Sequence, residues 1–423
     1  MRLQRTPITW AIYGVNGAWA AFIYLTGPVS PILAEDLGMS LAAAGLVGTA
    51  LALGMVTASL TAPWVVRQLG RARSMKFGLL VVCAALISMI LVPIVASGPV
   101  AFGIILGLVW VGATGGGILL NASTARLSDA HPAHSARVIT EANAAAAWVG
   151  LFSPLILGAA LGAGLGWQVG ILACLIAAVA ALAGLFVADR MTARSRRDGV
   201  GDQDPRGDAR ELEVEPALEP VLVPPPPTAT AREPLPRVFW LAMVGLFAAV
   251  ATEFAINYWG STLIQEQTGS SASSATAAMA AVVTGVAIGR TVGSALTHRL
   301  GPHRMLLGGF GLALVGFAVL WTATTVPLSV VGLFVAGLGI ATLFPLLLDR
   351  GIVLSAGRPD LAMARSSLVL GLAAGTAPFA LGALGSVMSV RMALLLVPAV
   401  AVVGMVGVVA SRPAAPGPSS VTS

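Results

Sequence analysis

Charged residues are scarce in this chain of 423 residues. Only 10% are Asp, Glu, Lys or Arg, while 57% are hydrophobic and the mean hydropathy is +0.89. Soluble globular domains carry about 25% charged residues. The scarcity of charge therefore excludes an ordinary soluble domain and indicates that most of the chain lies in an apolar solvent.

Cysteine and histidine are almost absent. Cys83 and Cys174 are the two cysteines, and each falls inside a long apolar run, which favours packing over a disulfide or a metal role. The four histidines are dispersed at the ends of such runs, so we expect no metal site. The sequence also lacks a phosphate-binding Gly-Lys-Ser/Thr loop and a Ser/His/Asp set in a soluble segment. These absences argue against an ATP-driven pump or an enzyme, and no cofactor is expected.

Long apolar runs make up most of the chain. A bilayer core about 30 Å thick requires roughly 20 mainly apolar residues per helical span. The first run is too long for a cleavable signal peptide and lacks a small-residue cleavage site. The sequence therefore predicts an all-α polytopic membrane protein with twelve transmembrane helices, at 9–33, 42–66, 75–96, 100–125, 138–162, 167–188, 238–264, 275–297, 304–323, 327–348, 362–387 and 390–411.

The basic residues are distributed unevenly between the two ends of these spans. All but two of the 24 lie at one end; the exceptions are Arg290, deep inside a span, and Arg391, in a break at the other end. Basic residues near spans concentrate on the cytoplasmic side, which predicts cytoplasmic N- and C-termini. This arrangement explains the net charge of +6 without nucleic-acid binding. Since Lys76 is the only lysine, we interpret the composition as that of a bacterial cell-membrane protein.

An internal repeat relates the two parts of the chain. A shift of 231 residues aligns Gly14 with Gly245, Glu35 with Glu266, and Arg73 with Arg304. We expect two pseudo-symmetric six-helix bundles, at 1–188 and 237–412, followed by a cytoplasmic tail at 413–423. Residues 189–236 are acidic and proline-rich and cannot bury a core, so they are expected to form a disordered cytoplasmic linker. A passive tether is the favoured role of the linker, with partner docking as the alternative.

Four motifs in the second half carry a family resemblance. They are Glu253 with Trp259 six residues later, Gly289-Arg290, Phe344-Pro345, and Gly375-Thr376-Ala377-Pro378. The pattern resembles the major facilitator superfamily (MFS), and within it the branch of the fucose and glucose/galactose permeases. The resemblance implies a monomeric secondary transporter whose solute binds near the midplane, between the two halves.

The chain departs from this family in two places. Symporters of the fucose type have carboxylates in spans one and four, where this chain has Ala21 and Gly117. Proton coupling therefore cannot simply be transferred from the resemblance. In the family's loop motif after span two, Arg67 stands where an aspartate is expected. The cytoplasmic latch must therefore be built differently. Its candidates are the loop and gating residues Arg67, Gly70, Arg71, Arg73, Glu141, Gly301 and Arg304, with Glu141 expected to pair with Arg126 or Arg137.

Two charged residues lie deep inside spans. Glu253 lies 15 residues into span seven, roughly 22 Å from the cytoplasmic end. Arg290 lies in the inner half of span eight, at a depth that differs by about 10 Å, which argues against a direct pair. Their repeat counterparts are Phe22 and Ser59, so the shared scaffold does not require the charges. Intramembrane charges are costly and are functional candidates by default. For Glu253 a proton-coupling or solute-binding role is favoured over a structural anchor, and for Arg290 the structural role is favoured.

Neutral polar and aromatic groups accompany these charges within the spans. Aromatic rings and amides suit a sugar-like or other polar solute, by stacking and hydrogen bonding. For each of these side chains, packing or anchoring at the membrane interface explains its presence about as well as solute binding does. The candidates are Asn16, Trp19 and Tyr24 in span one, Asn121 in span four, Asn143 in span five, and Asn257, Tyr258 and Trp259 in span seven.

Three function classes compete. Gradient-driven uptake of a small polar solute is favoured by the permease-like motifs. A proton-coupled exporter of drugs or metabolites is the alternative, favoured by the absence of acidic residues from spans one to four. A transport-like sensor is the weakest reading, because the linker is too sparse to be an output domain. The predicted partners are a small-molecule substrate and the lipid bilayer, without nucleic acid.

The predicted orientation can be tested by cysteine labelling. Single cysteines introduced at Ser97 and Ser270 should react with an impermeant maleimide added outside intact cells, because both positions lie in breaks opposite the basic residues. A cysteine at Asp204, in the linker, should react only after the membrane is permeabilised. External labelling at Asp204 would contradict the orientation.

Overall fold

The computed structural model describes residues 5–200 and 234–412. Within these ranges it contains no β-strand and has twelve helical spans long and apolar enough to cross a membrane, as predicted. The first half comprises α1 (Pro7–Asp36), α2 (Leu41–Leu69), α3 (Arg71–Val95), α4 (Gly98–Ala130), the short 3₁₀ helix η1 (Pro132–His134), α5 (Ser135–Gly150), α6 (Phe152–Gly162) and α7 (Gln168–Val200).

The second half repeats this arrangement. Its helices are α8 (Arg237–Thr268), α9 (Ala272–Ala278), α10 (Ala280–Leu300), α11 (Pro302–Thr322), α12 (Val326–Ile340), α13 (Leu343–Val353), α14 (Pro359–Val387), α15 (Val390–Ala393) and α16 (Leu396–Ala410). Four spans are each broken into two helices: α5 and α6, α9 and α10, α12 and α13, and α15 and α16.

Prolines account for three of the four breaks. A proline lacks the N–H that would bond to the carbonyl four residues earlier, and its ring clashes with that carbonyl. Pro154, Pro345 and Pro398 stand four, five and five residues after the last residue of α5, α12 and α15, respectively. The break at Met279 has no such proline. These positions are points at which a span can bend without losing further hydrogen bonds.

Helix α1 accommodates its internal prolines by a different device. Pro31 leaves the carbonyl of Gly27 without its usual helical donor, and the Ser30 hydroxyl donates to that carbonyl at 2.9 Å. Within a membrane such a side-chain bond replaces a backbone bond that water cannot supply. The helix therefore continues to Asp36.

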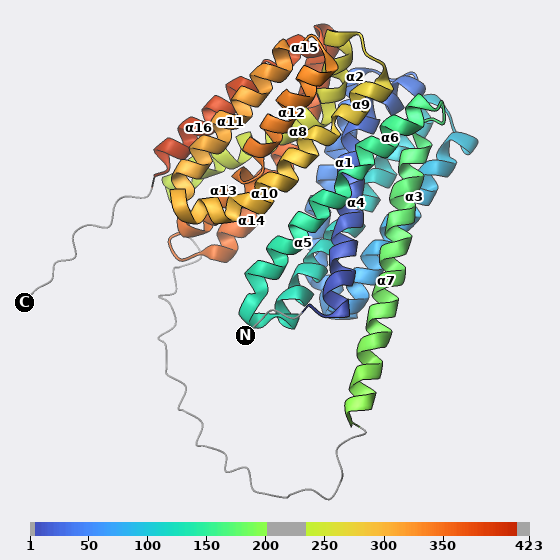
Figure 1. Cartoon of the computed structure of the whole chain (residues 1–423), viewed down its shortest axis with the longest axis vertical. Helices are drawn as coiled ribbons and strands as arrows, with labels where there is room; N and C mark the ends of the chain where they lie inside the picture. The colour runs from blue at the N-terminus through green and yellow to red at the C-terminus, as the bar shows by residue number, and fades with distance from the viewer. Residues whose placement is uncertain (1–4, 201–233, 413–423) are drawn as a thin grey trace, which may run out of the picture.

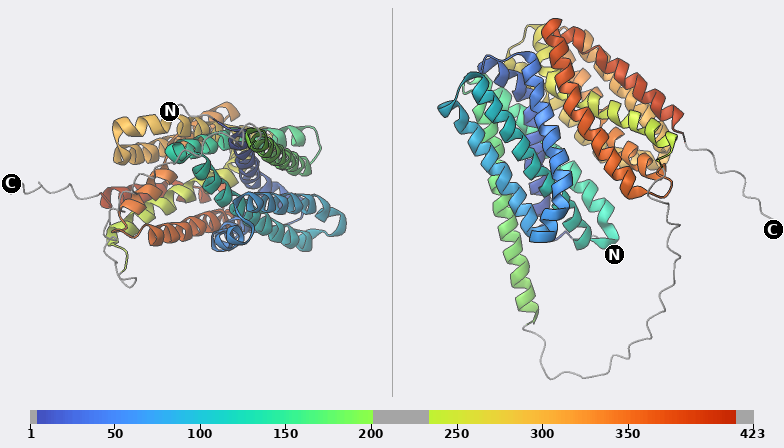
Figure 2. Two further views of the ribbon diagram at one scale, coloured as in Figure 1. Left: turned by 90° about the horizontal axis from the view of Figure 1, so that it is seen from below. Right: turned by 180° about the vertical axis from the view of Figure 1, so that it is seen from behind.

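The two halves stand side by side as separate bundles (Figure 1). We call the end at which α1 and α8 begin the basic end, and the opposite end, which carries α15 and the start of α9, the far end. Helix α2 packs along α14, and α6 packs along α9. Both views of the bundles show the halves together at the far end and spread apart at the basic end (Figures 1 and 2).

Small residues bring α2 and α14 into backbone contact. A Cβ added to Gly45 would lie 2.6 Å from the Phe379 Cα and the Pro378 carbonyl oxygen. One turn further along α2, the Thr49 hydroxyl donates to the Gly375 carbonyl at 2.6 Å. Glycines allow such close approach of helices where lipid provides no hydrophobic drive. This contact joins the halves at the far end.

The outer surface of the spans is apolar. Large hydrophobic side chains such as Ile94, which is 77% exposed, and Val387, which is 86% exposed, project from the bundles. An exposed apolar surface of this extent is typical of helices that face lipid. The lipid bilayer is therefore the environment that the fold requires.

Helix α7 extends further than expected. It continues to Val200, twelve residues into the segment that the sequence assigns to the linker. The rest of the linker, residues 201–233, and the tail from residue 413 lie outside the described residues. Their predicted disorder, and the position of Asp204, remain predictions.

The contact at Gly45 can be tested by substitution. In Gly45→Val, the added side chain must separate α2 from α14, so the far end should open. A reporter cysteine at Ser30, which is 1% exposed in α1, should then label faster from outside. Gly107→Val is the matched control, because a Cβ there meets no atom within 4 Å. Equal labelling in the two variants would contradict the assigned closure.

Candidate functional site

Three ionisable side chains come together at mid-depth, where the halves meet. Glu253 belongs to α8, Arg290 to α10 and Tyr24 to α1. The charges of Glu253 and Arg290 both act on Tyr24, and the charge of Arg290 acts on Glu253. Glu253 and Arg290 are partly exposed, whereas Tyr24 is buried. The structure thus brings three of the predicted site residues together, from both halves.

Glu253 and Arg290 interact without forming an ion pair. Among the described residues, neither takes part in a salt bridge or a side-chain hydrogen bond. Along their helices, Glu253 lies about 24 Å and Arg290 about 15 Å from the basic end. The sequence-based expectation that they do not pair directly agrees with this geometry.

Helices α1 and α8 cross closely on the far-end side of Glu253. A Cβ on Gly27 would lie 2.5 Å from the backbone carbonyl of Asn257. Beside it, the Tyr258 hydroxyl donates to Thr26 Oγ1 at 3.4 Å, and its ring stacks on Phe254 at 6.0 Å. Asn257 and Tyr258 are buried. They therefore lie at the contact between the halves, one turn from Glu253.

The polar candidates of the first half are more dispersed. Asn16 is 4% exposed and accepts a hydrogen bond from Ser123 at 2.9 Å, which ties α1 to α4. Trp19 is buried against Gly116, and its indole N–H has no partner among the described residues. Asn121 is exposed and donates to its own helix, and Asn143 is exposed. The structure shows no contact between these amides and the three central groups.

Trp259 makes a specific contact inside the second half. Its side chain is 1% exposed, and Nε1 donates to the Pro378 carbonyl at 3.0 Å. The bond joins two of the motifs that carry the family resemblance, Glu253-x5-Trp259 and Gly375-Thr376-Ala377-Pro378. It also ties α8 to α14, so this ring is engaged in holding the two helices together.

A cluster around Glu141 braces the first half at the basic end. Its carboxylate accepts from Arg5 Nη2 at 2.8 Å, Tyr13 at 3.0 Å and Arg137 at 3.1 Å. The predicted partner Arg137 is confirmed. The sequence reasoning missed Arg5 and Tyr13, because a pairing across 136 residues leaves no local pattern.

The alternative prediction, that Glu141 pairs with Arg126, is wrong. Arg126 Nη2 instead pairs with Asp189 at 2.7 Å, and Lys76 pairs with the same carboxylate at 2.6 Å. Asp189 lies near the end of the transmembrane part of α7, so α3, α4 and α7 are joined there. The Asp189 carboxylate, rather than that of Glu141, therefore neutralises Arg126, and it neutralises Lys76 as well.

The loop-motif candidates mark a turn that occurs once in each half. Gly70 joins α2 to α3 with φ 75°, and Gly301 joins α10 to α11 with φ 80°. A positive φ favours glycine, which explains why the repeat carries glycine at both positions. Arg71 pairs with Asp129 at the end of α4. The side chains of Arg67, Arg73 and Arg304 are exposed at the basic end.

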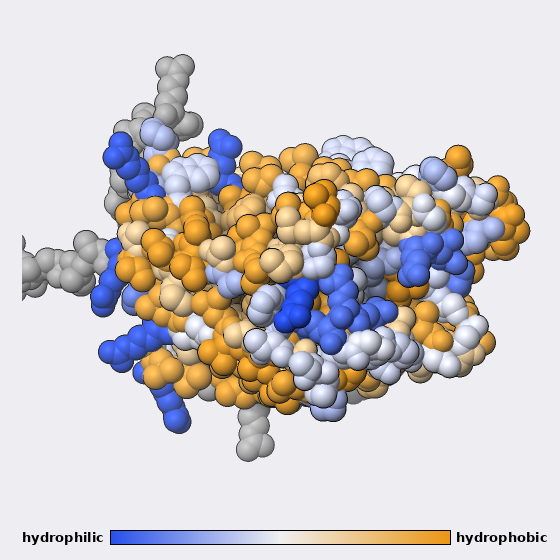
Figure 3. All heavy atoms as spheres, turned by 90° about the horizontal axis from the view of Figure 1, so that it is seen from above, coloured by the Kyte–Doolittle hydropathy of each residue, from blue (hydrophilic) through white to orange (hydrophobic). Residues whose placement is uncertain are grey.

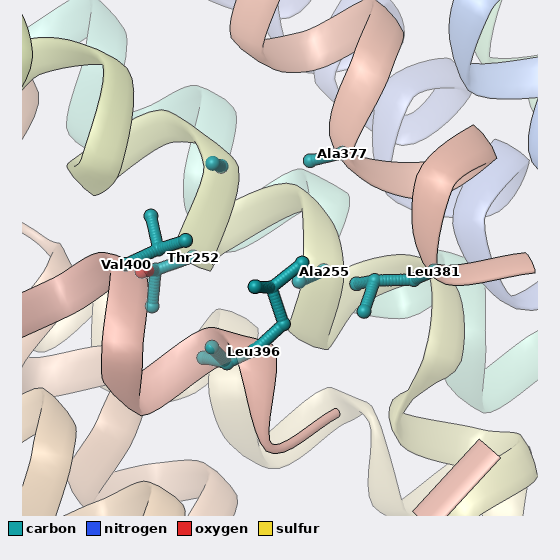
Figure 4. Close-up of a pocket in the computed structure, with 8 residues that line it drawn as sticks. Thr252, Ala255, Ala377, Leu381, Leu396 and Val400 are labelled. Atoms are coloured by element: carbon teal, nitrogen blue, oxygen red, sulfur yellow. The ribbon is translucent and has the colours of Figure 1, made fainter. Parts of the chain in front are cut away.

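Two pockets lie apart from the central residues. One, of about 30 Å³, lies between α8, α14 and α16 (Figure 4). It is lined by aliphatic side chains and by Thr252, whose buried hydroxyl has no partner among the described residues. It has room for a water molecule but not for a solute. The other, of about 420 Å³, lies between the halves at the far end and includes Glu35 and Glu266. Hydrophilic side chains gather near the middle of that end (Figure 3).

No metal site is found among the described residues. No group of three His, Cys, Asp or Glu side chains lies close enough to hold an ion. Cys83 and Cys174 are buried and are not joined to each other.

The architecture defines a polytopic helical membrane protein built from two helical bundles. The sequence model of the Major Facilitator Superfamily matches residues 14–350. The chain belongs to this superfamily of transporters. No curated protein sequence matches the chain significantly.

Solved structures share the fold at low sequence identity. A D-xylose–proton symporter superimposes with a TM-score of 0.70 at 13% identity, covering 97% of this chain and 98% of that one. A bacterial homologue of the human lysosomal transporter Spinster, inward-facing and unoccupied, gives 0.67 at 15% identity, with 96% of each chain covered. The xylose transporter XylE from E. coli, in a partially occluded inward-open conformation, gives 0.68 at 10%, covering 95% and 96%.

The anchoring contact of Trp259 predicts a loss of stability. Trp259→Phe keeps an aromatic ring but removes the hydrogen bond to the buried Pro378 carbonyl, and the loss of one such bond typically costs about 0.5–1.5 kcal/mol. The melting temperature of the purified protein should fall. Trp10→Phe is the control, because Trp10 is 60% exposed and should leave the melting temperature unchanged. A normal melting temperature together with weakened solute binding would instead assign Trp259 to the binding site.

Proposed function

We propose that the protein carries a small polar solute across the cytoplasmic membrane by alternating access, with Glu253 coupling the movement to a proton gradient. The observation that carries the proposal is the position of Glu253. It is the acidic residue at mid-depth, it lies where the halves meet, and it has no salt bridge among the described residues.

The arrangement of the halves supports alternating access. They touch along α2 and α14 and along α6 and α9 at the far end, and they spread at the basic end (Figure 2). If the basic end faces the cytoplasm, as the distribution of arginines indicates, this is an inward-facing state. Rocking of one half against the other would exchange the open side while the central residues stay between them.

The chemistry of Glu253 supports coupling. Glu253 is an ionisable carboxyl group inside an apolar span, and its charge interacts with that of Arg290. The protonation of such a group depends on its exposure to water and on nearby charges. Rocking of the halves changes the distance to such neighbours and the access of water. The group can therefore bind a proton on one side and release it on the other.

The competing functions have less support. The symporter and XylE resemble this chain in fold, and their sugars suggest a polar solute without identifying it. No specific contact among the described residues favours the alternative function, a proton-coupled exporter. Membership of the fucose and glucose/galactose permease branch and a monomeric state remain proposals, as do the roles of Asn16, Trp19, Asn121 and Asn143 in solute binding.

Substitution of Glu253 tests the coupling. A panel of labelled sugars and sugar acids is first screened for uptake into proteoliposomes. With the best-transported solute, Glu253→Gln should abolish the stimulation by an imposed pH gradient but retain exchange, because the amide keeps hydrogen bonding but cannot carry the proton. Glu253→Ala should impair both activities.

The control for this experiment is Asp349→Asn, which removes an exposed carboxylate of α13. It should behave as the wild type. Wild-type rates with unchanged pH dependence in both Glu253 variants would overturn the proposal.

A further inference from the structure

Arg290 forms no ion pair among the described residues. It lies within α10, ten residues from its end, and is partly exposed. Among the described residues it takes part in no salt bridge or side-chain hydrogen bond. Several other charges near the ends of the spans are neutralised, since Lys76 and Arg126 share Asp189 and Arg5 and Arg137 share Glu141. The buried Arg350 of α13 donates to the Val408 carbonyl instead. A guanidinium keeps its proton in proteins, so Arg290 brings a fixed positive charge to the centre.

The charge balance of the centre depends on the state of Glu253. In the empty, deprotonated site, the charges of Glu253 and Arg290 cancel. When Glu253 takes up the coupled proton, the positive charge of Arg290 is left without a counter-charge. A net charge in an occluded site within the membrane is costly. A neutral sugar would not remove this charge, whereas a solute with one negative charge would.

We propose that the transported solute is a small monoanion, such as an aldonic acid or another hydroxy acid, whose carboxylate binds Arg290 while the proton resides on Glu253. This inference rests on the proposed function and specifies the substrate class of the same site. The loaded site and the empty site are then both electrically neutral. Proton and anion cross together, and the cycle moves no net charge.

The surrounding groups suit the uncharged part of such a solute. Tyr24 lies within the electrostatic reach of both charges. Asn257, one turn from Glu253 on α8, adds an amide where α1 and α8 cross. Hydroxyl groups can donate to and accept from such side chains. Arginine also binds carboxylates through two parallel hydrogen bonds, which an ammonium group cannot reproduce.

Matched pairs of probes test the charge of the solute. The full-length protein in detergent is titrated with D-gluconate and D-glucose, and with D-xylonate and D-xylose, and binding is followed by tryptophan fluorescence and by melting temperature. At least one aldonate should bind at pH 5.5, and its neutral partner should bind at least about tenfold more weakly, the usual size of a charge-assisted contact.

Variants locate the contact. Arg290→Gln should weaken binding of that aldonate about tenfold or more and leave the weak binding of the neutral sugar unchanged, and Arg290→Lys should recover part of the loss. Arg299→Gln is the control, because it removes an exposed arginine from the same helix and should bind as the wild type. The melting temperature without probe shows whether each variant is folded.

The outcomes separate this inference from the proposed function. Tight binding of a neutral sugar that persists in Arg290→Gln, or failure of both aldonates to bind, overturns the monoanion assignment. Glu253 can still couple a neutral solute in that case, and the pH-gradient experiment decides this separately. In proteoliposomes, aldonate uptake driven by a pH gradient should not respond to a potential imposed with potassium and valinomycin. A strong response would contradict the neutral loaded site.

Discussion

The cost of placing a charge inside a bilayer organises the polar residues of this protein. Insertion measurements put that cost at about 3 kcal/mol for a charged residue at the centre of a helix. Near the basic end the cost is met by shared partners, with Asp189 between Lys76 and Arg126 and Glu141 between Arg5 and Arg137. Glu253 and Arg290 lie deeper and interact without pairing. The contrast separates charges that stabilise one half from charges that lie where the halves meet.

The packing of the helices keeps each half rigid while leaving the contact between the halves adjustable. Ionic clusters and the Trp259 bond connect helices within one half. The contacts between halves rely on backbone approach at Gly45 and on single hydrogen bonds such as Thr49 to Gly375. Few polar bonds need to break when such a surface separates. The proline breaks supply bending points within the spans.

Hydropathy and charge predicted most of the fold from the sequence. An apolar run of about 20 residues is long enough to cross the bilayer as a helix, in which every backbone hydrogen bond is satisfied, so the twelve spans followed from length and composition. The two halves followed from the internal repeat. Boundaries were less certain, as the extension of α7 to Val200 shows. The break after Gly150 depends on Pro154, whose presence was visible, but not every proline breaks a helix. Pro31 does not, because Ser30 compensates for it.

The site was predictable only in part. Glu253 and Arg290 were evident because charge is rare in spans, and the repeat showed that the scaffold does not require them. Partners from distant parts of the chain were not evident. Arg5 binds Glu141 across 136 residues. Arg350, which follows the predicted span at 327–348, is 8% exposed and donates to the Val408 carbonyl at 3.0 Å. Such contacts depend on how helices lean together, which one sequence does not encode locally.

Proton movement linked to solute movement tests the central claim most directly. Proteoliposomes that contain the protein and an internal pH dye are given an inward gradient of a transported solute, without an initial pH difference. Coupling through Glu253 predicts that the interior acidifies as the solute enters, and that Glu253→Gln vesicles exchange the solute without any pH change. Solute entry into wild-type vesicles at constant internal pH would contradict the account.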